Sequence, residues 1–187
     1  MQFLDELFAC KKFETWELDR DTLDAILVEQ MPEDYASLCA TIYMSFALKH
    51  ERTPLIWGDK NNFHTGYLPL LNAIYPEARF LHIVRDGRDV ACSYREVMQH
   101  GSLSPYSPHL ATGIDEIATE WCANVLKVDN YLSSIAASQH RLIRYEDLVQ
   151  DTTGILTEIC RWLGLHFESA MLTAHEANRR MNLEPAL

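Results

Sequence analysis

The sequence predicts an α/β fold in which a parallel sheet is flanked by helices. The short apolar run Phe80–Val84 has the length and composition of a buried strand, and His140–Tyr145 is interpreted as a further strand. Segments with helical periodicity precede, separate and follow them. Strands that alternate with helices are typical of parallel sheets joined by crossover connections.

The chain has the length of a single domain, residues 1–187, with a helical segment over 1–52 and an α/β part over 53–187. Asp21 opens a first amphipathic helix, which ends before Pro32. Pro32 and the acids after it are expected in the first turn of a second, longer helix with an aromatic stripe. These aromatic side chains are interpreted as core.

Residues 54–58 are predicted to form a short buried strand that ends in a turn-rich segment carrying Lys60. A helix follows, which Pro76 ends, and the strand Phe80–Val84 comes next. The order over 54–94 is then strand, helix, strand, helix, which predicts parallel strands with Lys60 and Arg85 at the same edge. The alternative for Lys60 is an exposed lysine in a turn.

The segment from Arg79 to Tyr94 is the main candidate for a ligand site, because it places Arg85 at the carboxyl end of a strand and just before a helix. Asp86 or Asp89 can cap that helix, and Ser93 offers a hydroxyl further along it. Ligands of open α/β sheets bind at this edge, where helix N–H groups and an arginine fork suit a phosphate. The alternative is a surface ladder of ion pairs made by the two arginines and two aspartates, which contributes little energy.

The second half of the chain contains four further predicted segments. Residues 101–113 form a loop, either a substrate lid or disordered, and Ile114 begins a long core helix that runs to Ile135. The strand His140–Tyr145 is followed by a helix over 152–163 that ends at Gly164. The tail from residue 168 is expected to be helical.

Composition excludes several classes of function. The net charge of −11 argues against a nucleic-acid partner, although the segment around Arg85 is locally basic. We expect no membrane span, no secretory signal and a cytoplasmic location. The five cysteines are scattered, and with the eight histidines they show no metal-ligand spacing, so no metal is expected.

Three segments, in this order, resemble the sulfotransferases, and most closely the bacterial-type and tyrosylprotein sulfotransferase-like branch. They read W-G-D-K-N-N at 57–62, P-E-A-R-F-L-H-I-V-R-D-G-R-D-V-A-C-S at 76–93, and R-Y-E-D-L at 144–148, followed by L-G-L at 163–165. The resemblance covers about residues 35–170. It implies a P-loop-like α/β fold that binds 3′-phosphoadenosine 5′-phosphosulfate (PAPS) and transfers its sulfuryl group to a hydroxyl or amine acceptor.

The resemblance also implies roles for individual residues. Arg85 and Ser93 would hold the 3′-phosphate of PAPS or of its product, adenosine 3′,5′-bisphosphate (PAP). Lys60 would stabilise charge on the bridging oxygen, and Tyr145 would lie against the nucleotide. Glu146 would brace the loop. Sulfuryl transfer, like phosphoryl transfer, needs positioning and cationic stabilisation of the leaving group, which these residue types can supply.

The chain departs from the family pattern at several points. It lacks the glycine-containing R-x-G-T-T-type loop and the first strand, it has Asn62 where a proline is usual, and Glu6 only falls near the position of a catalytic acid. We therefore expect a truncated sulfotransferase, weakly active or inactive alone, with an exposed sheet edge. The alternative is a catalytically inactive nucleotide-binding or interaction module derived from a sulfotransferase. A third possibility, a P-loop kinase, is disfavoured because G-x-x-x-x-G-K-[ST] is absent.

Overall fold

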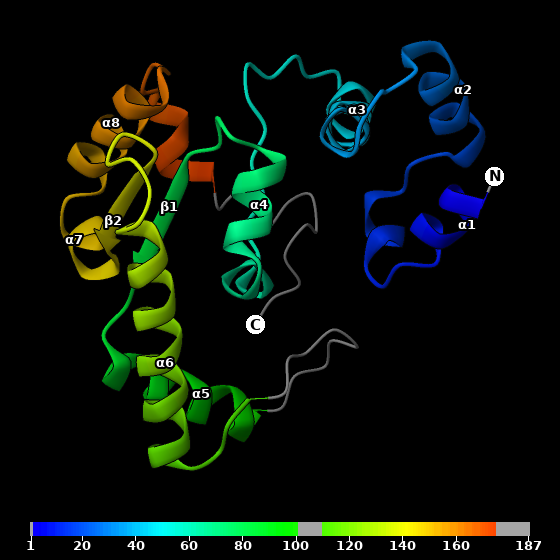
Figure 1. Ribbon diagram of the computed structural model, residues 1–187. Coiled ribbons are helices and arrows are strands. Elements are labelled where there is room, and N and C mark those ends of the chain that lie inside the picture. Colours follow the sequence, from blue (N-terminus) through cyan, green and yellow to red (C-terminus); the bar gives the residue numbers. More distant parts are fainter. Residues whose placement is uncertain (1, 101–109, 175–187) are drawn as a thin grey trace. The chain divides into compact units, whose positions relative to one another are not determined.

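The computed structural model of the chain describes residues 2–100 and 110–174 (Figure 1). Two compact units can be distinguished, and each is described by itself. The first comprises residues 1–64 and 70–76, and the second comprises residues 65–69 and 77–187. The expected single domain stays a prediction. Most of the expected 101–113 loop and the end of the expected helical tail lie outside the described residues.

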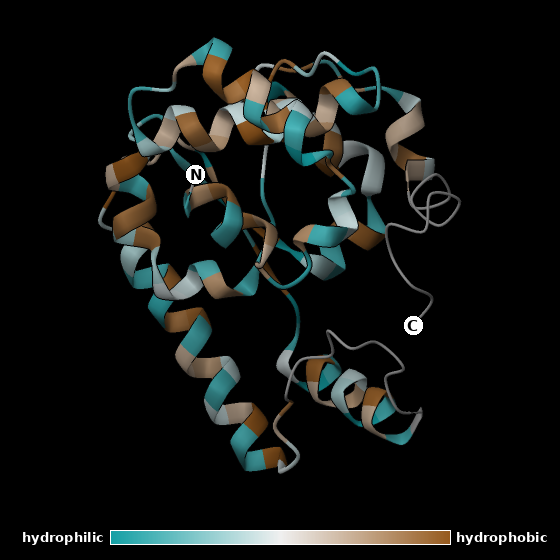
Figure 2. Cartoon of the chain, turned by 90° about the vertical axis from the view of Figure 1, so that its right-hand side faces the viewer, coloured by the Kyte–Doolittle hydropathy of each residue, from teal (hydrophilic) through white to brown (hydrophobic). Residues whose placement is uncertain are grey.

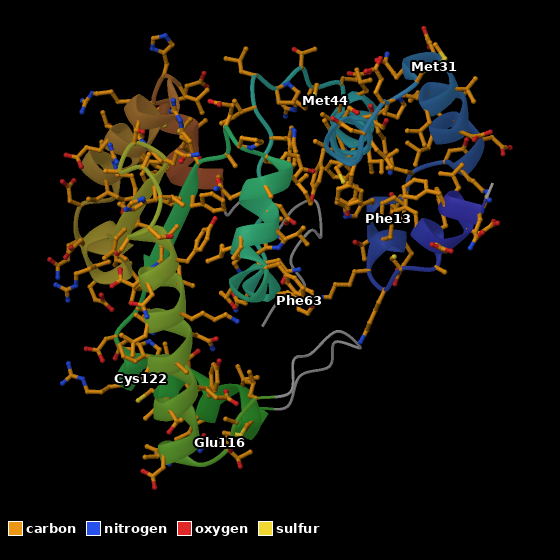
Figure 3. The ribbon with its side chains drawn as sticks, in the orientation of Figure 1. Phe13, Met31, Met44, Phe63, Glu116 and Cys122 are labelled. Atoms are coloured by element: carbon orange, nitrogen blue, oxygen red, sulfur yellow. The ribbon has the colours of Figure 1, made fainter. Side chains whose placement is uncertain are left out.

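The first unit is helical, as the sequence predicted for residues 1–52. It contains α1 (Gln2–Phe8), the 3-10 helix η1 (Phe13–Trp16), α2 (Arg20–Gln30) and α3 (Tyr35–Lys49). A core cluster joins these four helices, and Phe13, labelled in Figure 3, belongs to it. The buried members of the cluster are Leu4, Phe13, Leu23 and Ile42.

Side-chain caps determine where α2 and α3 begin. The Asp19 carboxylate accepts a hydrogen bond of 2.8 Å from the backbone N–H of Thr22. Asp34 accepts one of 2.7 Å from the N–H of Ser37, whose hydroxyl accepts one of 3.1 Å from the N–H of Asp34. This capping box starts α3 at Tyr35, so Pro32 precedes the helix instead of occupying its first turn.

The prediction of a strand over residues 54–58 is wrong. The structure has no strand there, and the side chains of Leu55 and Ile56 are 87% and 48% exposed. Trp57 packs by its ring instead, stacked on Tyr43 with centroids 4.4 Å apart. Lys60 therefore follows no strand, and the predicted strand order no longer places it at the same sheet edge as Arg85.

Within the described residues, the second unit contains a sheet of two strands, β1 (Phe80–Val84) and β2 (His140–Arg144). They are parallel, as expected for strands joined by helices, and Val84 pairs with Arg144 at their carboxyl ends. The fold is therefore a mostly helical α/β fold whose sheet is smaller than predicted.

Helices surround this small sheet. Between the strands come α5 (Gly87–His100) and α6 (Ile114–Leu132), and β2 is followed by α7 (Tyr145–Gln150), α8 (Thr152–Leu163) and the 3-10 helix η3 (Ser169–Thr173). In Figure 1, α7 and α8 lie beside β2, and α6 extends away from the sheet with α5 against its far half. Brown and teal segments alternate along the helices in Figure 2, as expected for amphipathic helices.

A second core cluster holds α6 against β1. Its buried residues are Leu68, Val128 and Leu132, and Phe80 of β1 packs against them. Leu68 is the first residue of α4 (Leu68–Ile74), which follows the 3-10 helix η2 (Asn62–Gly66). The first two residues of α4 belong to the second unit, and its other residues belong to the first. The cluster anchors the C-terminal half of α6, and this leaves the N-terminal half to pack against the segment that follows β1.

Candidate functional site

The turn that joins β1 to α5, formed by Arg85, Asp86 and Gly87, is the centre of the candidate site. The Asp86 carboxylate accepts a hydrogen bond of 2.8 Å from the backbone N–H of Arg88 and so caps α5, as predicted. The Arg88 guanidinium binds the same carboxylate at 2.6 Å. This charge-assisted hydrogen bond holds the pKa of Asp86 well below its usual range. Arg88 is thus one member of the alternative ion-pair ladder, and its charge is already neutralised.

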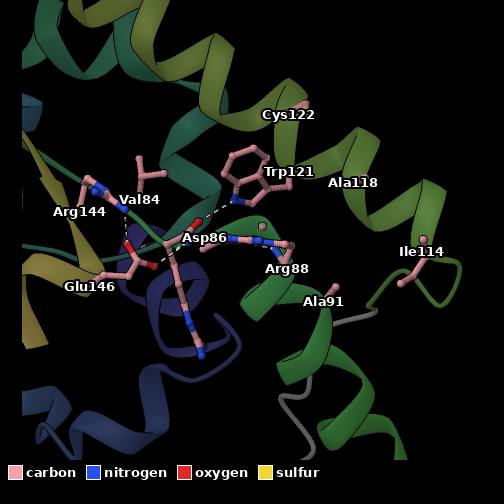
Figure 4. Close-up of a pocket in the computed structure, with 12 residues that line it drawn as sticks. Val84, Asp86, Arg88, Ala91, Ile114, Ala118, Trp121, Cys122, Arg144 and Glu146 are labelled. Atoms are coloured by element: carbon pink, nitrogen blue, oxygen red, sulfur yellow. Dashed lines mark hydrogen bonds and ion pairs between the residues drawn. The ribbon is translucent and has the colours of Figure 1, made fainter.

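The peptide group between Arg85 and Asp86 is held from two sides (Figure 4). The indole N–H of Trp121, on α6, donates to the Arg85 carbonyl oxygen at 3.0 Å. The backbone N–H of Asp86 donates to Oε1 of Glu146, on α7, at 2.8 Å, and this bond lowers the pKa of Glu146. Glu146 therefore braces the turn as predicted, whereas the sequence had indicated only a core position for Trp121.

Gly87 permits the close approach of α6 to this turn. A Cβ atom at Gly87 would lie 3.0 Å from Cδ2 of Trp121, closer than ordinary van der Waals contact allows. The indole ring therefore packs directly on the backbone where α5 begins. Glycine is needed here for space and not for an unusual backbone angle.

Arg85, unlike Arg88, has no counter-ion within the turn. Its Cζ lies 5.2 Å from the ring centroid of Tyr145, and its buried Nε has no hydrogen-bond partner. No carboxylate in the described part of the chain forms an ion pair with it. The two residues meet because each directly follows one of the paired strand ends, Val84 and Arg144.

A cavity of about 540 Å³ lies beside the turn (Figure 4). Apolar side chains from α5 and α6 line one part of it, and charged groups from the turn and from the start of α7 line the other. The lining residues are Val84, Arg85, Asp86, Gly87, Arg88, Ala91, Ile114, Ala118, Trp121, Cys122, Arg144 and Glu146. A positive group at the edge of an open cavity, near a helix N-terminus, is suited to an anionic ligand.

The other two predicted site residues, Ser93 and Lys60, are not part of the contact between Arg85 and Tyr145. Ser93 is in the second turn of α5, partly buried, and its Cβ is tilted toward the N-terminus of that helix. Lys60 is exposed and belongs to the first unit, whereas Arg85, Ser93 and Tyr145 belong to the second. Beside Lys60, Nε2 of His64 lies 2.9 Å from Oδ2 of Asp59, a pair that the sequence did not single out.

Comparison with known proteins identifies the class of protein. The model of the sulfotransferase family matches residues 3–169, and the chain belongs to this family. The omega-hydroxy-beta-dihydromenaquinone-9 sulfotransferases Stf3 of Mycobacterium tuberculosis and Mycobacterium bovis are both similar to it. Each is 29% identical over 111 residues, which cover 57% of this chain and 28% of the relative. The chain thus matches just over a quarter of the length of these relatives.

A solved structure supports the fold. The sulfotransferase domain from the curacin biosynthetic pathway superimposes with a TM-score of 0.54 at 20% sequence identity. The match covers 84% of this chain and 54% of that domain. The second unit's parallel strands and flanking helices therefore form part of a sulfotransferase-like fold.

Two further observations concern the described residues alone. No helix within residues 2–100 or 110–174 is long and apolar enough to cross a membrane. In the same ranges, no cluster of three or more histidine, cysteine, aspartate or glutamate side chains has the arrangement of a metal site.

Proposed function

We propose that the chain binds PAPS and transfers its sulfuryl group to a hydroxyl or amine acceptor. The observation that carries this proposal is the guanidinium of Arg85, which has no counter-ion among the described residues and lies at the carboxyl end of β1, 5.2 Å from the Tyr145 ring. A 3′-phosphate would supply the missing negative charge, and a nucleotide would lie against the exposed side of Tyr145. Family membership implies the same donor.

In this proposal, Arg85 and Ser93 hold the 3′-phosphate. The guanidinium offers a planar fork that matches phosphate oxygens, and Ser93 adds a hydroxyl from two turns into α5. The start of α5 contributes the positive end of its helix dipole. Arg88 contributes little, because Asp86 already occupies its guanidinium at 2.6 Å.

Lys60 is proposed to stabilise the leaving group. The sulfur–oxygen bond to the bridging oxygen breaks as sulfur bonds to the oxygen or nitrogen of the acceptor, whose proton is released to solvent, and negative charge develops on the bridging oxygen of the departing PAP. An ammonium group lowers the energy of that charge in the transition state. The name of the mycobacterial relatives describes a hydroxylated substrate, which favours a hydroxyl acceptor.

A second candidate is a nucleotide-binding module without catalysis. It is favoured by the grouping of the binding residues, Arg85 and Tyr145, in the second unit, whereas Lys60 belongs to the first. The two candidates share the 3′-phosphate site and differ in whether Lys60 acts on bound donor.

Calorimetric titration of the full chain with PAP tests the shared part of both candidates. We expect Arg85→Ala to weaken binding by about 30-fold or more, because removing one partner of a buried charge pair costs about 2 kcal/mol at least. Arg79→Ala is the matched control, since Arg79 precedes β1 at its opposite end. Equal affinity of the wild-type chain and Arg85→Ala would refute the proposed site.

Release of PAP from PAPS then separates the two candidates. With 2-naphthol as the probe acceptor, Lys60→Ala is expected to slow PAP release while leaving the affinity for PAP unchanged. A wild-type chain that binds PAP and turns over no PAPS, with or without the probe, would favour the binding module.

A further inference from the structure

We propose that Trp121 is a positioning residue, which directs Arg85 toward the 3′-phosphate by fixing the peptide group that follows it. This inference rests on the proposed function, because it concerns how the same site becomes selective. Trp121 does not need to touch the nucleotide. It acts through one hydrogen bond to the Arg85 carbonyl and through its packing on Gly87.

The two hydrogen bonds at this turn act on a single peptide group. The carbonyl of Arg85 and the N–H of Asp86 belong to the same planar unit, and in a trans peptide they point in opposite directions. Trp121 binds the first at 3.0 Å and Glu146 binds the second at 2.8 Å. Rotation of this peptide would break both bonds at once, so its orientation is fixed by two different helices, α6 and α7.

The rest of the turn is fixed as well. Asp86 caps α5 through the Arg88 N–H, and the indole ring leaves no space for the backbone at Gly87 to move toward α6. The backbone on the C-terminal side of Arg85 is therefore held by contacts with α6 and α7 and by the cap of α5, and β1 holds the other side. The side chain that starts from this point belongs to Arg85, for which the described part of the chain supplies no counter-ion.

Rigidity of this kind has a functional consequence. A guanidinium that is already directed at its ligand loses less conformational freedom on binding, which improves affinity. This gain in affinity comes from the contact between Arg85 and the 3′-phosphate, so it does not apply to a nucleotide that lacks this phosphate. Loss of the Trp121 hydrogen bond should therefore reduce discrimination between ligands with and without a 3′-phosphate.

The chain offers a matched control for this hydrogen bond. The indole N–H of Trp162, on α8, donates to the Ser138 carbonyl at 2.9 Å, also to a backbone oxygen in a connecting segment. Trp162 lies outside the residues that line the cavity. Trp162→Phe thus removes an equivalent bond from the same unit without touching the turn.

The experiment measures the affinities of PAP and adenosine 5′-monophosphate (AMP), which lacks the 3′-phosphate, for the full chain. Trp121→Phe keeps a ring over Gly87 and removes the N–H donor. We expect it to weaken PAP binding by about five- to tenfold, the usual effect of one lost hydrogen bond, while AMP binding stays unchanged. Trp162→Phe should leave the ratio of the two affinities at its wild-type value.

The other outcomes are distinguishable. Wild-type chain that binds PAP no more tightly than AMP would overturn the proposed function and the role of Trp121 together. A wild-type ratio that persists in folded Trp121→Phe would overturn the role of Trp121 alone, as would equal weakening of both ligands. Should Trp121→Phe not fold, Glu146→Met frees the same peptide group from its other side and is expected to lower the ratio, whereas Glu146→Gln, which keeps an acceptor oxygen, should retain most of it. An unchanged ratio in Glu146→Met would overturn the role of Trp121, because Trp121 is proposed to act only through the orientation of this peptide.

Discussion

Replacing Gly87 with alanine should destabilise the chain because of a single close contact. The added methyl group would lie 3.0 Å from Cδ2 of Trp121, whereas ordinary contact begins at 3.4 Å. The indole must withdraw by several tenths of an ångström, and this lengthens its 3.0 Å hydrogen bond to the Arg85 carbonyl. Overpacking costs about 1–3 kcal/mol and the weakened hydrogen bond up to about 1.5 kcal/mol. The higher helix propensity of alanine offsets at most about 1 kcal/mol of this destabilisation.

Taken at their midpoints, these contributions give a net destabilisation of roughly 2 kcal/mol, which corresponds to a decrease in melting temperature of roughly 4–8 °C for a chain of this length. Thermal unfolding followed by circular dichroism measures it. Gly58→Ala is the control, because no heavy atom lies within 4 Å of its added methyl group. Gly87→Ala that melts at or above the wild-type temperature would show that the indole does not constrain the turn as described.

Three further predictions concern the stability of the two units. Asp34→Ala removes the capping box with Ser37 and should cost about 1 kcal/mol, seen as a lower urea midpoint; an unchanged midpoint would contradict the role of the cap. Leu23→Ala empties a fully buried site in the first core cluster and should cost about 2–5 kcal/mol, and a loss below about 1 kcal/mol would mean that the site collapses freely. Burial lowers the pKa of His82 below its usual 6.5, although Asp129 opposes the shift. The unfolded chain therefore binds the proton more readily, so the contribution of His82 to stability is present above pH 6.5 and is lost as the pH falls through the lowered folded pKa. His82→Gln should show a smaller decrease in urea midpoint between pH 7.5 and pH 5 than wild type, and equal decreases would contradict this assignment.

The sequence predicted the helices and the paired strands well, because their signals are local and repeated. Phe80–Val84 and His140–Arg144 are continuous apolar or mixed runs bounded by breaks, and both became strands. Residues 54–58 carried the same kind of signal without forming a strand. A run of five apolar residues does not distinguish a strand from an irregular segment that is anchored by one aromatic ring, here Trp57 on Tyr43.

The candidate site was predictable in part for a similar reason. Arg85 and Tyr145 each follow a strand directly, so parallel pairing of the strands brings them together. Trp121 was missed because a tryptophan at helical spacing has the pattern of a core residue, and its partner is a carbonyl 36 positions away in the chain. The available signal was Gly87, a glycine at the start of a helix where most residues would be tolerated, which indicates the close approach of another element.

We propose the Arg85 guanidinium as the receptor for a 3′-phosphate. The most direct test is a crystal structure of the full chain with bound PAP. We expect the 3′-phosphate within hydrogen-bond distance of the Arg85 guanidinium and the Ser93 hydroxyl, with the nucleotide against Tyr145 and the Arg85–Asp86 peptide still bound by Trp121 and Glu146. A 3′-phosphate bound elsewhere, with Arg85 still over Tyr145 and free of the ligand, would contradict it.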